Sequence, residues 1–242
     1  TVPLMLQIIH FSKPTTFLRF RRGIFRLPER LIKSILSIGM APFMIQSCAC
    51  VVVIIVNNTL ATHGGDLQIG AYGIANRMQF IFVMVVLGLT QGMQPIVGYN
   101  YGAKRHDRVK SALMHTIFWA TLVTTLGFII CEFIPETVAK AFTTEPALIE
   151  HAAWAMKTMC IFMPFIGFQL VTTNFFQSVG LVNKSIFLSL TRQVLLLIPL
   201  LLILPHFIGE KGVWYSMPIS DIIAAILTVI MLMLQFREWS KA

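Results

Sequence analysis

The stretch that decides the fold is residues 81–110, "IFVMVVLGLTQGMQPIVGYNYGAKRHDRVK". Its first ten residues are almost entirely apolar, its middle carries two glutamines and a proline, and its last seven residues contain four basic side chains. A long apolar run that ends in a tight positive cluster is typical of a helix that crosses a membrane and emerges into water.

The composition of the whole chain also indicates a membrane protein. Of the 242 residues, 56% are hydrophobic and 12% are charged, and the mean hydropathy is +0.77, whereas an ordinary soluble domain has roughly 25% charged residues. A soluble fold of this size could not bury so much apolar surface. Several runs exceed the roughly 18 residues that mark a membrane-spanning helix, and they are continuous, unlike the alternating strands of a membrane barrel. We therefore predict an all-α polytopic membrane protein.

The net charge of +9 would favour nucleic acid as the partner of a soluble protein. Here the basic residues lie between hydrophobic spans. The lipid bilayer is therefore the expected partner, and no nucleic acid is expected.

Six spans are predicted from the apolar runs, at residues 35–60, 71–99, 109–133, 151–178, 185–207 and 213–236. Together they define a six-helix unit over residues 35–237, followed by a short tail at 238–242. A basic linker at residues 13–34 precedes it and predicts a short amphipathic helix on the membrane surface. Residues 1–12 are expected to be the end of a preceding helix. Because the chain starts at Thr1 and not at Met, we expect a fragment of a longer protein.

Positive charge is concentrated in every second loop. The linker is basic, the loop after the second span carries Lys104, Arg105, Arg108 and Lys110, and Lys184, Arg237 and Lys241 follow the fourth and sixth spans. The intervening loops contain only Lys140 and Lys211. Basic loops stay in the cytoplasm, so the linker, the basic cluster at 104–110 and the C-terminus are predicted to be cytoplasmic. A binding role for the cluster is the alternative to a topology signal.

Amide side chains within the spans are the candidates for a substrate cavity. An amide in lipid needs a partner, so these side chains should face other helices or water. With Met44, whose thioether adapts to varied ligands, the candidates are Gln46, Asn57, Asn76, Gln79, Gln91, Gln94, Gln169, Asn174 and Gln177. The alternative for each amide is an interhelical hydrogen bond, worth roughly 0.6–2 kcal/mol.

Charged residues within spans form a separate group, because an intramembrane charge is by default a functional hypothesis. Arg77 and Asp221 each lie roughly 10 Å from the outer ends of their spans at 1.5 Å per residue. We hypothesise an ion pair between them, which would lower the burial cost of both and could serve coupling. Arg192 lies about two turns from the cytoplasmic end of its span, so it is expected to reach the lipid headgroups.

Five prolines lie within the spans, and each removes a backbone hydrogen bond and tends to kink its helix. They are Pro42, Pro95, Pro164, Pro199 and Pro218. They suit either close packing of a helical bundle or spans bent around a central cavity, as in transporters.

Enzyme signatures are absent from the sequence. It contains no glycine-rich phosphate loop, no HExxH, no GxSxG and no carboxylate pair within a span, and its four cysteines lack metal-ligand spacing. We therefore predict no catalytic residue, no metal site and no cofactor. Without an ATP-binding domain in these residues, transport would be driven by a gradient of H⁺ or Na⁺.

Four motifs in series carry a resemblance to a known family. They are "GLTQGMQPIVGYNYGAKRHDRVK", "FFQSVG", "LSLTRQVLLLIPLLLILP" and "GVWYSMPISDIIA". Together, in order and spacing, they resemble the C-terminal half of the multidrug and toxic compound extrusion (MATE) transporters, over essentially the whole chain. The bacterial multidrug-export branch is the most similar.

The resemblance implies a twelve-helix protein of two six-helix lobes, related by a pseudo-two-fold axis and joined by a cytoplasmic linker. This chain would be the C-terminal lobe, and its partner would be the missing N-terminal six-helix lobe. The resemblance further implies a multi-pass protein of the bacterial inner membrane that exports small lipophilic cations in exchange for H⁺ or Na⁺. Such transporters work by alternating access.

One family feature is absent. The sodium-coupled branch carries an acidic residue on the first and on the fourth span of this lobe, and neither span has one here. The coupling acid is therefore expected in the N-terminal lobe, and the coupling ion stays open between H⁺ and Na⁺. The alternative functions are a flippase for lipid-linked oligosaccharides or another solute exporter of the superfamily. A membrane-embedded enzyme or a channel would need a catalytic cluster or a pore motif that the sequence lacks.

Overall fold

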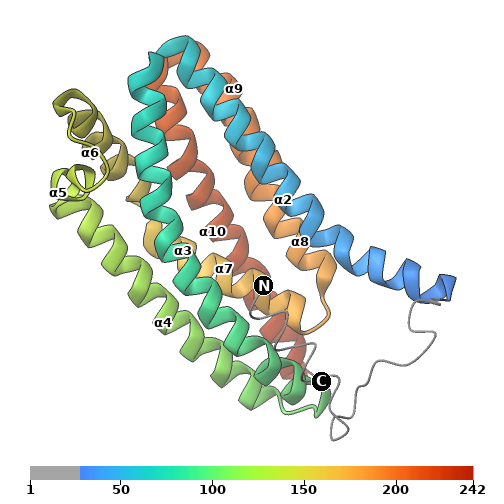
Figure 1. Ribbon diagram of the computed structural model, residues 1–242. Helices are drawn as coiled ribbons and strands as arrows, with labels where there is room; N and C mark the ends of the chain where they lie inside the picture. Colours follow the sequence, from blue (N-terminus) through green and yellow to red (C-terminus); the bar gives the residue numbers. More distant parts are fainter. Residues whose placement is uncertain (1–27, 242) are drawn as a thin grey trace, which may run out of the picture. The chain divides into compact units, whose positions relative to one another are not determined.

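A computed structural model describes residues 28–241 (Figure 1). The chain divides into two compact units, residues 1–43 and 44–242. The preceding helix and most of the basic linker predicted from the sequence lie outside the described residues. In the first unit, the structure describes the beginning of helix α2 (Glu29–His63), so the last residues of the predicted linker are helical.

The second unit continues α2 from Met44, and every further element of the described residues is a helix. In chain order these are α3 (Gly65–Gly102), α4 (His106–Phe133), α5 (Pro135–Lys140), α6 (Pro146–Cys160), α7 (Met163–Ser178), α8 (Val182–Leu190), the π-helical segment η1 (Thr191–Leu197), α9 (Ile198–Ile208) and α10 (Glu210–Lys241). The residues predicted to form a tail, up to Lys241, therefore belong to α10.

Five helical stretches of the described residues are long and apolar enough to cross a membrane, and a bent pair makes up to six. The five are Phe43–Thr62, Gly65–Gly102, His106–Phe133, Val182–Ile208 and Glu210–Trp239. The bent pair is α6 with α7, whose axes differ by 52°. These helices confirm the predicted all-α membrane fold, and the bent pair takes the place of the predicted fourth span.

Two of the five prolines lie at breaks in the helices. Pro164 is the second residue of α7, directly after the bend, and Pro199 is the second residue of α9, directly after η1. Because proline has no N–H, the carbonyl four residues earlier loses its helical partner. At the second break the ladder widens, and the N–H of Ile198 donates to the carbonyl of Gln193, five residues back. Pro95 and Pro218 lie inside α3 and α10 without ending either helix.

Helices α9 and α10 form a tight hairpin (Figure 1). A Cβ atom on Gly212 would lie 2.5 Å from the backbone carbon of Leu204 and from the nitrogen of Pro205. Only glycine allows two backbones to approach this closely, as small residues do at many membrane helix interfaces. The hairpin holds η1 beside α10, and the candidate site lies between them.

Two clusters of buried side chains hold the helices of the second unit together. In the first, the fully buried Trp214 meets Tyr72 and Trp154 edge to face, with ring centroids 6.4 and 5.7 Å away. The second centres on Phe175 and Phe176 of α7, both fully buried, against α3, α4 and α10. Lipid is as apolar as these side chains, so close packing, and not removal from water, is what favours this arrangement.

Candidate functional site

The site is built around an ion pair inside the helix bundle. Nε of Arg192, on η1, donates to Oδ1 of Asp221, on α10, at 2.7 Å. The Asp221 side chain is 5% exposed and the Arg192 side chain 25%. A buried carboxylate needs such a partner, because a lone charge in an apolar interior is costly.

The predicted pair of Arg77 with Asp221 is therefore wrong, and so is the expectation that Arg192 reaches the headgroups. Arg77 is exposed on α3, and no ion pair of Arg77 is present in the described residues. The sequence-based depths were measured from helix ends that the structure moves. Asp221 lies about 16 Å along α10 and Arg192 about 15 Å from the start of α8, at 1.5 Å per residue. Both residues therefore lie further from the helix ends than the sequence predicted. The α9–α10 hairpin brings the two residues side by side.

A small, partly open cavity of about 110 Å³ adjoins the pair. Its polar lining comes from Tyr72 and Gln79 of α3, Arg192 of η1, and Ser220 and Asp221 of α10. The apolar lining comes from Val52, Met159, Leu197 and Met217. A cavity of this size with several hydrogen-bonding groups has room for more than one water molecule.

Buried oxygen atoms without a hydrogen-bond partner among the described residues lie on both sides of Arg192. They are Oγ1 of Thr191 and Oε1 of Gln193. Buried polar atoms are usually satisfied, and π-helical turns are often found at functional sites. Two side-chain oxygens beside Arg192 thus have no partner within residues 28–241.

The structure places the predicted cavity candidates on several surfaces, and it brings Gln79 and Asp221 together in the cavity beside Arg192. Gln169 is buried, and its Oε1 has no hydrogen-bond partner in the part of the chain that the structure describes. Asn174 donates to the carbonyl of Leu170 at 2.9 Å, a bond within its own helix. Exposed candidates are Met44, Gln46, Asn76, Gln91 and Gln177, and half-buried ones are Asn57 and Gln94.

The predicted basic cluster surrounds the turn between α3 and α4, where Lys104, Arg105, Arg108 and Lys110 are all exposed. Lys104 adopts a left-handed backbone conformation with φ of 56°. The N–H of Lys104 donates to the carbonyl of Tyr101 and that of Arg105 to Asn100, which closes the helix end in a Schellman turn. The Nζ atom of Lys110 lies 5.3 Å from the ring centroid of Phe236 on α10. The cytoplasmic location of this turn stays a prediction.

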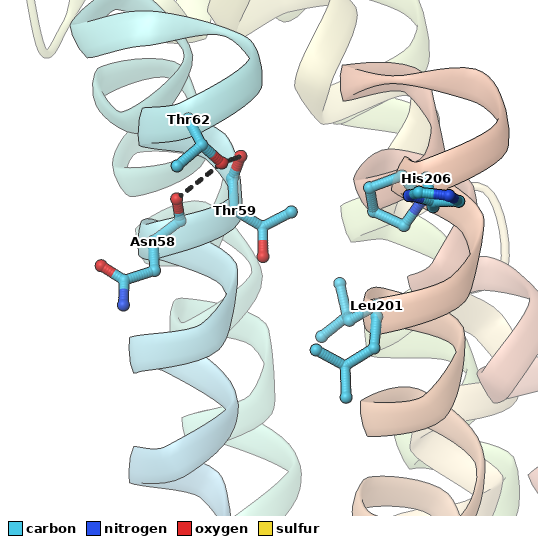
Figure 2. A pocket seen from close by; sticks show the side chains of 7 residues that line it. Asn58, Thr59, Thr62, Leu201 and His206 are labelled. Carbon is cyan, nitrogen blue, oxygen red and sulfur yellow. Dashed lines mark hydrogen bonds between the residues drawn. The ribbon is translucent and has the colours of Figure 1, made fainter.

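Sequence reasoning missed an open pocket of about 440 Å³ between α2 and α9 (Figure 2). Its lining residues are Asn58, Thr59, Thr62, Leu201, Leu202, Pro205 and His206. The hydroxyl of Thr62 donates to the carbonyl of Asn58 at 3.2 Å and to that of Thr59 at 3.0 Å. The helical spacing of Asn58 and Thr62 was the available signal, but nothing in the sequence showed that α9 would face them.

No group of three or more His, Cys, Asp or Glu side chains in the described residues is arranged to hold a metal ion.

Comparisons with known proteins place the chain among membrane transporters. The family model described as MatE matches residues 42–203. The multidrug export protein MepA of Staphylococcus haemolyticus is 23% identical over 222 residues, which cover 92% of this chain and 48% of MepA. The FAD transporter of Shewanella oneidensis is 25% identical over 69% of this chain and 37% of its own length.

Among solved structures, the MATE multidrug transporter DinF-BH is 35% identical, with a TM-score of 0.80. The match covers 96% of this chain and 51% of DinF-BH. The chain thus spans about half the length of DinF-BH and of the MepA proteins it matches.

Proposed function

Because the chain belongs to the MatE family, we propose that it is the C-terminal lobe of a two-lobe exporter of small lipophilic cations, driven by exchange for H⁺ or Na⁺. The observation that carries the proposal is the 35% identity to DinF-BH, a MATE multidrug transporter, over 96% of this chain. The similarity to MepA multidrug export proteins over more than nine-tenths of the chain supports it.

The polar face of α3 supports a second lobe. Arg77, Met84, Gly88 and Gln91 are all exposed, and their spacing of three, four or seven residues places them on one side of the helix. An exposed guanidinium and an exposed amide within a membrane-spanning helix are costly if they face lipid. We infer that this face lines a water-containing space between this lobe and its partner. There, an amide and a thioether could meet a flat apolar cation.

The arrangement of buried clusters suits alternating access. Side chains from α3, α6 and α10 interlock in the first cluster, and side chains from α3, α4, α7 and α10 in the second. Because packed interiors resist continuous deformation, such a unit moves mainly as a body. In the proposed mechanism, the lobe rocks against its partner and opens the space between them to one side of the membrane at a time.

The proposed location is the bacterial inner membrane, with the α3–α4 turn and the C-terminus in the cytoplasm. Support comes from the alternation of basic and non-basic loops along the sequence. The bacterial origin of the MepA relatives agrees with this location.

The test uses the whole protein, expressed in a drug-sensitive bacterium that lacks its main efflux pumps. Ethidium accumulation is followed by fluorescence with and without a protonophore, at two sodium concentrations, against cells with an empty vector. The proposal predicts lower accumulation that the protonophore or sodium removal restores. Unchanged accumulation of ethidium and of every other cation tested would contradict it.

A second candidate substrate class is an anionic dinucleotide, because the FAD transporter of Shewanella oneidensis matches 69% of the chain. The exposed Arg77 on the α3 face would suit an anion. Flavin released into the medium, measured in the same cells, separates this candidate from cation export. A flippase for lipid-linked oligosaccharides is the next candidate if neither compound moves.

A further inference from the structure

The carboxylate of Asp221 must be paired with a cation or neutralised by a proton, because it is buried within the helix bundle. It lies about 16 Å along α10, near the middle of a membrane-spanning helix, and is 4% exposed. Removing the partner of a buried charge is strongly unfavourable, because the charge is then left unpaired in an apolar interior. Arg192 is the partner in the conformation seen here.

The contact between Arg192 and Asp221 leaves room for a second cation. The two side chains share one hydrogen bond, from Nε to Oδ1, and no other hydrogen bond reaches Asp221 from the part of the chain that the structure describes. The cavity beside the carboxylate is also lined by Tyr72, Gln79 and Ser220, whose side chains each carry an oxygen atom. Ser220 donates its proton to the carbonyl of Met217, which leaves its oxygen free to accept or to coordinate. A carboxylate, an amide and hydroxyls are the hard oxygen ligands that small cations prefer.

Arg192 lies on a segment of its span that departs from the regular α-helix. It belongs to the π-helical segment η1, and the neighbouring Thr191 and Gln193 each keep a buried oxygen unpaired among the described residues. Rewinding of a π-turn into an α-turn changes the direction of its side chains relative to the facing helix. Arg192 is also the more exposed member of the pair, 25% against 5%, so its side chain has more room to move than that of Asp221.

We propose that Asp221 is a cation-exchange site of this lobe, occupied by Arg192 in this conformation and by a monovalent cation, H⁺ or Na⁺, when η1 withdraws Arg192. For H⁺, a hydronium ion in the cavity gives its proton to a carboxylate oxygen of Asp221, and the ion pair opens. For Na⁺, the carboxylate and the cavity oxygens replace part of the hydration shell of the ion. In both cases Asp221 remains neutralised and Arg192 carries one free positive charge towards water.

This inference rests on the proposed transport function and deepens it by placing a coupling site in this lobe. It differs from the expectation that the coupling acid lies in the partner lobe. The titratable or charged groups that face the cavity beside Asp221 in the described residues are Tyr72 from α3 and Arg192 from η1. From α2 and α6 the cavity receives only the apolar Val52 and Met159.

The test measures cation binding to the purified whole protein through its thermal unfolding midpoint, which needs no transport. One arm titrates Na⁺ at pH 8 with choline as the control salt, and a second arm varies pH without Na⁺. The first arm reports on Na⁺ and the second on H⁺. The variants are Asp221→Asn, Arg192→Gln and the milder Arg192→Lys, and the matched control is Arg237→Gln, at an exposed arginine near the end of α10.

The proposal predicts that the unfolding midpoint of Arg192→Gln rises at about tenfold less Na⁺, or changes with pH about one unit higher, than that of the wild type. The reason is that the Arg192 side chain no longer competes with the ion for Asp221. Arg192→Lys, which keeps a competing cation, shifts the response less. Asp221→Asn loses the response, and Arg237→Gln behaves as the wild type. If Arg192→Gln does not fold, the comparison of Asp221→Asn with the wild type still decides.

If the unfolding midpoint of Asp221→Asn responds to Na⁺ and to pH as that of the wild type does, the proposal is overturned. So does full cation-driven transport by the charge-swapped variant Arg192→Asp/Asp221→Arg, since a purely structural pair tolerates the exchange. A wild-type protein that binds cations through Asp221 but exports nothing contradicts the proposed function and supports this site. If the Asp221→Asn variant still exports cations in exchange for H⁺ or Na⁺ as the wild type does, the proposed function is supported and the site at Asp221 is contradicted.

Discussion

Replacement of Gly212 by alanine should destabilise the α9–α10 hairpin. The added Cβ atom would lie 2.5 Å from the backbone of Leu204 and Pro205. Since ordinary carbon contacts are 3.5–4.0 Å, the two helices must separate locally by about 1 Å. Overpacking of this kind costs about 1–3 kcal/mol. Alanine recovers about 1 kcal/mol of helix propensity, which leaves a net loss of up to about 2 kcal/mol.

The matched control for this substitution is Gly73→Ala on α3. A Cβ at Gly73 meets no atom within 4 Å, so alanine there should be neutral or stabilising by up to about 1 kcal/mol. Equilibrium unfolding in mixed micelles gives both free energies, and the fluorescence of the buried Trp214, two residues after Gly212, reports on the hairpin. A Gly212→Ala protein as stable as Gly73→Ala would refute the reasoning, because the backbones would then not be in contact.

Three other predictions concern the turn, the core and the topology. Lys104→Gly should stabilise the protein by about 0.5–1 kcal/mol in the same unfolding assay, since glycine adopts the left-handed conformation at 104 without cost; a loss of stability would count against this turn. Phe175→Ala should destabilise by about 3–5 kcal/mol because the ring is fully buried, whereas Phe165→Ala, at a ring that is 52% exposed, should cost much less. In a cysteine-free background, Arg105→Cys should react with an impermeant maleimide only in inside-out vesicles and Lys211→Cys only in right-side-out vesicles; the opposite pattern would invert the topology.

The sequence predicts the helices well because composition and spacing determine them locally. The apolar run before Lys104 and the charges after it predicted a break between residues 99 and 109, and the structure places the turn within it, at residues 103–105. Pro164 predicted a kink in the fourth span, and the break lies directly before it. The size of the bend, 52°, depends on contacts with other helices and could not be predicted from the proline alone.

The site could be predicted only in part, because it depends on which helices are neighbours. Asp221 was identified as an intramembrane charge, but its partner was assigned to Arg77 from estimated depth. The hairpin at Gly209–Gly212 brings η1 against α10, and η1 carries Arg192. A π-helical segment leaves no clear sequence signal besides the following Pro199, so its unpaired polar atoms were also unforeseen.

The most direct test of the central claim is transport by the purified whole protein in liposomes. Ethidium is placed outside inside-out-oriented proteoliposomes that enclose DNA, and a gradient of H⁺ or Na⁺ is imposed with the higher concentration inside. The account predicts ethidium uptake, seen as a rise in fluorescence, that starts with one of the two gradients and stops when an ionophore collapses it. Uptake that is the same with and without both gradients, or equal to that of protein-free liposomes, would contradict a cation-coupled exporter.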